Sequence, residues 1–107
     1  MNDLNPETTR LETMRAAVRT LFDFNRQRGH AAWCDRDYDF VCPSMTTYPF
    51  QWFWDSCFHA IILSHLDLVR AESEITSLLA NQSPDGLVSH ATFWRREEYQ
   101  ELSLIHI

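Results

Sequence analysis

The sequence predicts an all-α fold, and three observations support this class. Only two glycines and four prolines occur among the 107 residues, so helices can run without interruption. The composition is 45% hydrophobic and 22% charged, which is typical of a globular chain and argues against disorder. Apolar residues also recur at helical spacing in three separate segments. The length predicts one domain or part of one.

Charge and hydropathy argue against two classes of partner. Nine lysines and arginines against fifteen aspartates and glutamates give a formal net charge of −6. Proteins that bind duplexes need a basic face to neutralise phosphates, so we expect no nucleic-acid partner. No apolar run approaches the roughly 18 residues of a membrane helix, and residues 1–7 lack the features of a signal peptide. We therefore expect a soluble cytoplasmic chain with no membrane partner.

The three cysteines, Cys34, Cys42 and Cys57, are irregularly spaced. In a cytosolic protein we expect them to be reduced thiols. A structural zinc site needs ligand pairs a few residues apart. Neither Cys34 with Cys42 nor Cys57 with His59 fits that pattern. The sequence thus predicts no metal site and no cofactor.

The first predicted element is a helix over residues 7–28. Asn5 suits the N-cap, and Pro6 suits the first helical position. Gly29 can adopt the left-handed conformation that often follows the end of a helix. One stripe of this helix carries the apolar residues Leu11, Met14, Val18, Leu21 and Phe22.

Residues 30–52 show no sustained period and contain two prolines, so we predict a long loop. Loops of this length in compact domains are usually functional or disordered. Five aromatic residues argue against disorder: Trp33, Tyr38, Phe40, Tyr48 and Phe50.

Two further helices are predicted to form an αα-hairpin. The first covers residues 54–69, and its buried stripe holds Phe58, Ile61, Ile62, Leu66 and Val69. The second begins near residue 71, and we place Glu74 on its solvent side. Residues 83–86, Ser-Pro-Asp-Gly, are a strong turn signal.

An aromatic cluster marks the start of this hairpin, because six of the fourteen aromatic residues lie between Tyr48 and Phe58. One interpretation is a hydrophobic staple that closes the loop onto the helix, with Asp55 as a helix cap. The other interpretation is a sugar site. Aromatic faces then stack on a sugar ring, while Gln51 and Asp55 bind its hydroxyls.

Residues 48–58, YPFQWFWDSCF, and residues 81–90, NQSPDGLVSH, together resemble the amino-terminal part of (α/α)6-barrel glycosidases. The resemblance covers about residues 10–95. It points to the mannosylglycerate hydrolase-like group of glycoside hydrolase family 63, which is distantly related to trehalases and glycogen-debranching glucosidases. It implies the N-terminal helical hairpins of an (α/α)6 toroid, the six-hairpin glycosidase fold, which is incomplete in this chain. A sugar pit is then expected at one end of the inner helices.

The same resemblance implies roles for particular residues. Tyr48 and Trp52 would shape the aglycone or acid side of the pocket. Trp54 and Asp55 would contact the sugar at the cleavage point. The secondary polar contacts would be Gln51 and His90.

This sequence departs from the family pattern at two positions. Phe53 stands where relatives more often carry Asn or Tyr, and Ser89 stands where they usually carry Pro. The second departure leaves two interpretations of His90 open, a sugar contact or an ordinary histidine of a surface loop.

The resemblance implies a glycoside hydrolase that acts with two carboxylates, one as acid and one as base. In the family both come from helices far downstream, so we expect no catalytic residue in this fragment and no activity from it alone. The predicted function is the substrate-pocket part of an enzyme that cleaves a small glucoside or mannoside, such as a glycosylglycerate or short oligosaccharide. The predicted partner is a small carbohydrate, and the oligomeric state stays open. The alternative is a non-catalytic helical sugar-binding or interaction module.

Residues 102–107, LSLIHI, are mostly apolar and differ in composition from the charged residues 95–98 before them. The codons CTG-TCT-CTT-ATA-CAC-ATC would encode them, a string that resembles the transposon end used to build sequencing libraries. We interpret residues 102–107 as a non-native tail and residues 1–101 as the N-terminal part of the glycosidase domain. The alternative is an ordinary apolar strand or helical turn.

Overall fold

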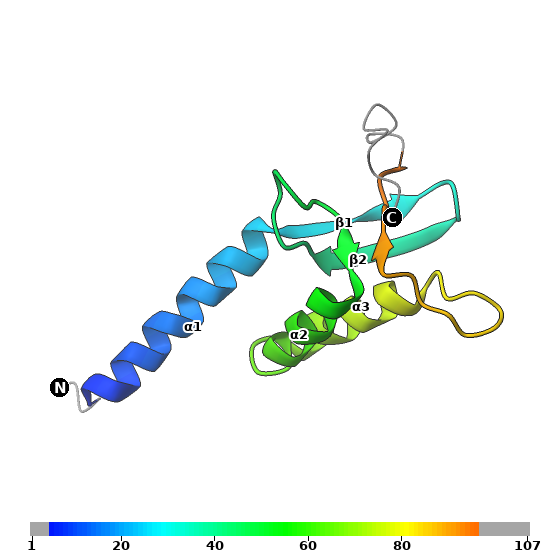
Figure 1. Cartoon of the computed structure of the whole chain (residues 1–107). Coiled ribbons are helices and arrows are strands. Elements are labelled where there is room, and N and C mark those ends of the chain that lie inside the picture. The colour runs from blue at the N-terminus through cyan, green and yellow to red at the C-terminus, as the bar shows by residue number, and fades with distance from the viewer. Residues whose placement is uncertain (1–4, 97–107) are drawn as a thin grey trace.

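The computed structural model describes residues 5–96, which form three helices and two small antiparallel sheets (Figure 1). The elements follow in the order α1 (Pro6–Phe24), β1 (Arg26–Ala31), β2 (Arg36–Val41), β3 (Gln51–Trp52), α2 (Phe53–Leu63), α3 (Leu68–Leu79) and β4 (Ala91–Thr92). The predicted all-α class, and with it the helical hairpins of an (α/α)6 toroid, is therefore wrong for this chain. The proposed tail at 102–107 lies outside the described residues.

The largest departure from the prediction is the β1–β2 hairpin, whose register runs from Arg26 opposite Val41 to Ala31 opposite Arg36. The sequence predicts the end of a helix and a loop over these residues. In β2, Tyr38 and Phe40 are buried on one face. The residues between and before them are aspartates, so the strand alternates apolar and polar side chains with a period of two. That alternation was the missed signal.

Helix α1 begins as predicted, because the Asn5 side chain accepts a hydrogen bond from the Thr8 amide at 2.8 Å. It ends at Phe24, four residues before the predicted end. Gly29 lies in β1 and has another role there. A Cβ at this position would come within 2.9 Å of the hydroxyl oxygen of Tyr38, its partner across the hairpin.

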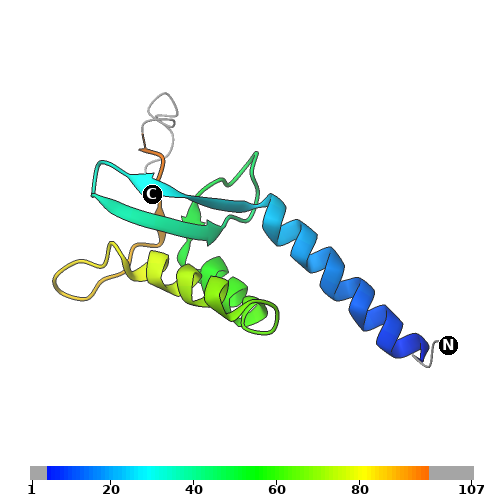
Figure 2. The same cartoon turned by 180° about the vertical axis from the view of Figure 1, so that it is seen from behind.

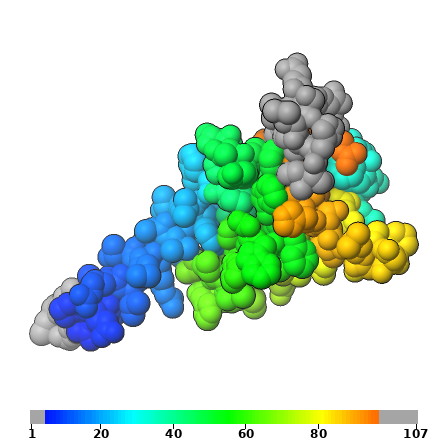
Figure 3. Space-filling view, viewed as in Figure 1, coloured from blue at the N-terminus to red at the C-terminus, as the bar shows by residue number. Residues whose placement is uncertain are grey.

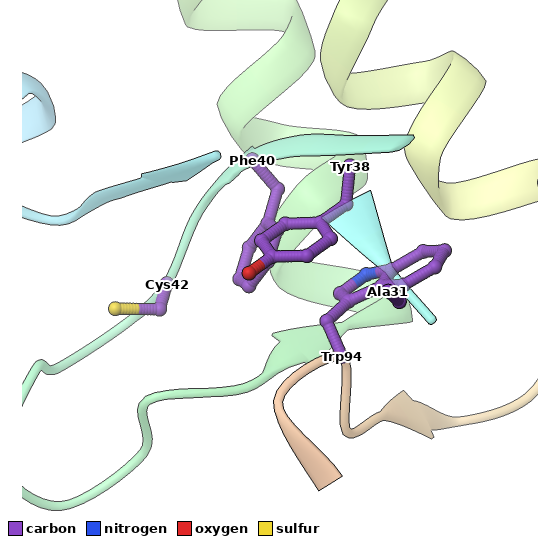
Figure 4. Close-up of a cluster of buried hydrophobic side chains, with 5 residues drawn as sticks. All are labelled: Ala31, Tyr38, Phe40, Cys42 and Trp94. Carbon is purple, nitrogen blue, oxygen red and sulfur yellow. The ribbon is translucent and has the colours of Figure 1, made fainter. Parts of the chain in front are cut away.

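The buried core lies between the hairpin and the segment after β4. The ring of Tyr38 stacks on Trp94 at a centroid distance of 5.3 Å (Figure 4). This cluster comprises Ala31, Tyr38, Phe40, Cys42 and Trp94. A second cluster joins Phe22 to Val41, Leu63 and Ala71. The hairpin therefore packs against Trp94 through the first cluster and against the helices through the second. Figure 2 shows from behind how the hairpin lies above α2 and α3.

The αα-hairpin is present as α2 and α3, and Asp67 caps α3 by accepting from the Arg70 amide. The predicted inner face of α2 is wrong. The buried residues are Ser56, Ala60 and Leu63, whereas Phe58 and Ile61 are exposed. Small side chains on the inner face let α2 and α3 pack closely. The apolar stripe read from the sequence faces outward instead.

Helix α1 projects from the rest of the described chain as an arm (Figure 3), in a body of 56 × 29 × 21 Å. Phe22 is its buried residue, and the apolar residues Leu11, Met14, Leu21 and Phe24 are exposed. Its last turns are held by an ion pair between Asp23 and Arg70. Among the described helices, none combines the length and apolar character that a membrane span requires.

Candidate functional site

A hollow of about 280 Å³ lies beside the junction of β3 and α2 and is lined by Pro43, Tyr48, Trp52 and Asp55. Since β3 runs directly into α2, Trp52 ends the strand and Asp55 lies in the first turn of the helix. Tyr48 is brought in by a short backbone bridge to Ser44. Three of the six predicted binding residues therefore share this hollow.

A fourth predicted residue, His90, lies beside Trp52 because β3 pairs with β4. Trp52 lies opposite Ala91, and the Phe53 amide donates to the His90 carbonyl oxygen at 2.9 Å. The Trp52 ring then meets two neighbours edge to face. Its centroid lies 5.5 Å from that of His90 and 5.9 Å from that of Tyr48.

Asp55 lies in the first turn of α2 and lines the hollow. Trp52 is the N-cap residue of α2, and the helix has no side-chain cap, so Asp55 is not the cap. Within residues 5–96, the Asp55 carboxylate accepts no hydrogen bond from another residue. Its charge acts on His59 of the same helix, because burial lowers the pKa of His59 and Asp55 raises it by a smaller amount. The N-terminal end of the helix dipole stabilises the negative charge of Asp55. Its oxygens therefore remain available to hydroxyl donors.

The indole nitrogen of Trp52 is buried and has no hydrogen-bond partner in the described part of the chain. A buried donor without an acceptor is uncommon in folded proteins. An acceptor supplied from elsewhere would remove the energetic cost of leaving this N–H unpaired.

Two predicted residues lie apart from the hollow. Trp54 is 66% exposed and packs its ring edge to face against Phe58 on the outer side of α2. Gln51 is 0% exposed and is bonded inward. Its Oε1 accepts from the Trp94 indole at 2.8 Å, and its Nε2 donates to Ser56 Oγ at 3.0 Å. Gln51 thus supports the junction from inside.

The structure reveals a buried carboxylate that the sequence analysis placed in solvent. Glu74 is 1% exposed, so its predicted place on the solvent side of α3 is wrong. Its Oε1 accepts from the Val41 amide at 2.9 Å, and its Oε2 accepts from the Ser56 hydroxyl at 2.7 Å. Burial raises the pKa of Glu74 from its ordinary 4.5 to about 7. Its spacing from Ala71 and Leu78, both buried, was the available signal.

His59 lies beside this carboxylate. Its Nδ1 lies 3.0 Å from the Val41 carbonyl oxygen, so this nitrogen carries the proton. Burial lowers the pKa of His59, which favours the neutral ring. No group of three or more His, Cys, Asp or Glu side chains within residues 5–96 is arranged to hold a metal ion.

Comparison with known proteins places the sequence of this chain in a family. Residues 48–105 match the mannosylglycerate hydrolase MGH1-like glycoside hydrolase domain. The chain belongs to this family. The match begins at Tyr48, the first aromatic residue of the hollow, and the predicted resemblance to the mannosylglycerate hydrolase-like group is confirmed.

Curated members of the family come from bacteria and a plant. The chain is 40% identical over 55 residues to the mannosylglycerate hydrolase of Thermus thermophilus, which is 50% of this chain and 13% of that protein. It is 35% identical over 54 residues to mannosylglycerate hydrolase MGH1 of Selaginella moellendorffii, 50% of this chain and 11% of that protein. It is 41% identical over 46 residues to the glucosylglycerate hydrolase of Mycolicibacterium hassiacum. The matched residues are 43% of this chain and 10% of that protein.

The matched part of the chain thus spans between 10% and 13% of the length of these relatives. No solved structure matches the chain.

Proposed function

We propose that this chain is part of a longer glycoside hydrolase and that the hollow at the β3–α2 junction forms part of its substrate pocket. The proposed substrate is a small mannoside or glucoside, such as a glycosylglycerate. The observation that carries the proposal is the meeting of two aromatic rings with an unbonded carboxylate, Asp55, in one hollow. The names of the family and of its curated relatives support the same substrate class.

The chemistry of the hollow suits a sugar. Because the rings of Tyr48 and Trp52 are nearly perpendicular, one of them can cover the apolar face of a pyranose ring and the other can close its side, while the Asp55 carboxylate accepts from ring hydroxyls. The volume of about 280 Å³ lies near the lower end of the range for small-molecule pockets, enough for one sugar unit. The exposed ring of Trp54 lies outside this hollow, so its proposed contact with the substrate is made on the outer side of α2.

The charge of Asp55 also sets the orientation of an acidic substrate. The carboxylate of a glycerate group would be repelled by Asp55 at close range. We therefore place the neutral sugar against Asp55 and the glycerate group away from this carboxylate, toward Tyr48 and Trp52. This orientation agrees with the role that the resemblance gives to Tyr48 and Trp52.

Hydrolysis needs an acid and a base on opposite sides of the glycosidic bond. Asp55 is the carboxylate that lines the hollow in the described residues. The proposal therefore assigns the reacting carboxylates to other parts of the longer protein, and it assigns to this chain the binding and orientation of the sugar.

The test uses the intact protein that contains this chain. Release of free sugar is measured from mannosylglycerate, from glucosylglycerate and from a neutral disaccharide, maltose. Hydrolysis of one glycerate conjugate, with a loss in Asp55→Asn but not in Glu72→Gln, supports the proposal; Glu72 is exposed on α3. Binding of sugars without any hydrolysis would favour a non-catalytic sugar-binding module instead.

A further inference from the structure

A buried chain of hydrogen bonds connects Glu74 to the residues beside the hollow. We infer that Glu74 is a positioning residue, which acts through Ser56 and Gln51 to hold Trp52 and Asp55 in place for the sugar. This inference rests on the proposed function for its substrate, but the bonded chain itself is a property of the fold.

The geometry begins with two bonds from the Glu74 carboxylate, one to the Val41 amide of β2 and one to the Ser56 hydroxyl of α2. Gln51 of β3 donates to Ser56 Oγ at 3.0 Å and to the Glu74 carbonyl oxygen at 3.2 Å. A residue of α3 therefore ties together β2, β3 and α2. Such a network fixes relative orientation more strictly than apolar packing alone.

Each of two hollow residues is the immediate neighbour in sequence of a residue in the buried hydrogen-bond network. Gln51 is buried and bonded, and Trp52 lines the hollow; Ser56 is buried and bonded, and Asp55 lines the hollow. Because adjacent residues share a backbone, movement of Gln51 or Ser56 must move Trp52 or Asp55. Within the described residues, the hydrogen bonds of the Glu74 carboxylate go to Val41 and Ser56 and not to Trp52 or Asp55, so Glu74 is a positioning residue and not a catalytic one.

A carboxylate is required at this position by the direction of the bonds. The Ser56 hydroxyl already accepts from Gln51, so its own proton needs an acceptor, which Glu74 Oε2 provides. A glutamine at position 74 whose oxygen accepts from Val41 would turn its amide N–H toward Ser56. The Ser56 proton would then lose its acceptor, although the shape of the side chain is unchanged.

The charged and titratable groups around Glu74 come from each element packed on it. His59 of α2 has Nδ1 4.0 Å from Glu74 Oε2. Asp39 of β2 raises the pKa of Glu74 and Arg70 of α3 lowers it, both less than burial does.

The experiment measures KM and kcat of the intact protein for mannosylglycerate and glucosylglycerate in Glu74→Gln, Ser56→Ala, the double variant and Glu72→Gln. We expect KM to rise roughly tenfold or more in each of the first three with a smaller change in kcat, and to stay at the wild-type value in the control. The double variant should cost no more than the larger single change, because both substitutions break one chain.

A readout without substrate separates this inference from the proposed function. Hydrogen exchange of residues 51–56 should accelerate in Glu74→Gln and Ser56→Ala while the helix core of α3 stays protected. If wild type hydrolyses neither conjugate but this exchange changes as expected, the proposed function fails and the positioning role stands. The positioning role would be overturned if the increases in KM of Glu74→Gln and Ser56→Ala simply added in the double variant. It would also be overturned if both single variants kept the wild-type KM and the wild-type rate of hydrogen exchange. If Glu74→Gln does not fold, Ser56→Ala alone decides in the same way.

Discussion

Trp94 donates its indole N–H to Gln51 Oε1 at 2.8 Å, which ties the residue two positions after β4 to the first residue of β3. Both side chains are fully buried. The contact joins residues 43 positions apart and, together with the pairing of β3 and β4, brings His90 beside Trp52. The candidate site is thus assembled by a contact between two separate stretches of the family match.

Asp55→Ala in the intact protein should lower kcat/KM without a large loss of stability. A hydrogen bond from a sugar hydroxyl to a charged acceptor in a dry pocket is expected to contribute about 2–4 kcal/mol to transition-state binding. This corresponds to a loss of roughly 30- to 1000-fold. The melting temperature should change little, because Asp55 does not cap α2. Turnover within about threefold of wild type, with a lower melting temperature, would contradict the sugar contact.

Trp54→Ala should reduce activity but not stability, because the ring is mostly exposed and contacts Phe58, which is also exposed. Loss of a stacking face should raise KM about three- to tenfold, the equivalent of an aromatic contact. The measurement is kcat/KM together with the melting temperature. Phe58→Ala is the matched control, since it removes the neighbouring ring of the same outer surface. Equal kinetics for wild type and Trp54→Ala would show that the sugar does not reach this ring.

Glu74 should make the stability of the protein depend on pH. The pKa of Glu74 is about 7 when folded and 4.5 when unfolded, so the folded state binds its proton more tightly. Its contribution is fully present below about pH 4.5 and is lost as the pH rises to about 7; the shift corresponds to about 3 kcal/mol. Denaturant unfolding of wild type and Glu74→Gln between pH 4 and 8 measures the difference between the two curves.

The difference between the two curves separates the effect of Glu74 from that of His59, which changes the stability with pH in the opposite direction. The lowered pKa of His59 means that its contribution to stability grows as the pH rises toward its ordinary value. Both proteins carry His59, so its effect cancels to first order. Parallel curves for wild type and Glu74→Gln over this range would contradict a raised pKa at Glu74.

Gly29→Ala should destabilise the hairpin. The new Cβ would lie 2.9 Å from the Tyr38 hydroxyl oxygen and 3.2 Å from Cζ, and the stacking on Trp94 restrains the ring. Overpacking of this kind usually costs about 1–3 kcal/mol of unfolding free energy. Thermal unfolding of Gly29→Ala alone and with Tyr38→Phe provides the check. Removal of the closest atom should recover part of the loss, and no recovery would place the strain elsewhere.

Local signals were the most reliable guide to the fold. The start of α1 follows from an Asn-Pro pair that caps and opens a helix. The turn at residues 83–86 follows from residues that close it by themselves, as in the Gly86 amide bond to the Ser83 carbonyl at 2.8 Å. The family was also readable, because the aromatic and acidic residues of the hollow are close together in sequence.

The remaining features depend on contacts between distant residues. The β1–β2 hairpin is stabilised by the stacking of Tyr38 on Trp94, which lies more than fifty residues later in the sequence. No local sequence pattern predicts that Trp94 is the partner. The inner face of α2 was misjudged because hydrophobicity ranks Phe58 above Ser56. Ser56 is buried because Glu74 and Gln51 satisfy its hydroxyl. The inward role of Gln51 could not be inferred before its partners were located.

Helix α1 projects as an arm that is held near its C-terminal end (Figure 3). It is held over its last two turns, where Phe22 is buried, Arg19 donates to the Leu66 carbonyl oxygen at 3.0 Å, and the Arg70 guanidinium donates to both Asp23 and the Phe22 carbonyl oxygen. With 19 residues the helix is about 28 Å long. A tilt of about 10° at Asn25 would therefore displace the Asn5 end by about 5 Å, by simple leverage on that length. Small changes in the packing of Phe22 are thus magnified at the tip, where a spectroscopic label would detect them with the greatest sensitivity.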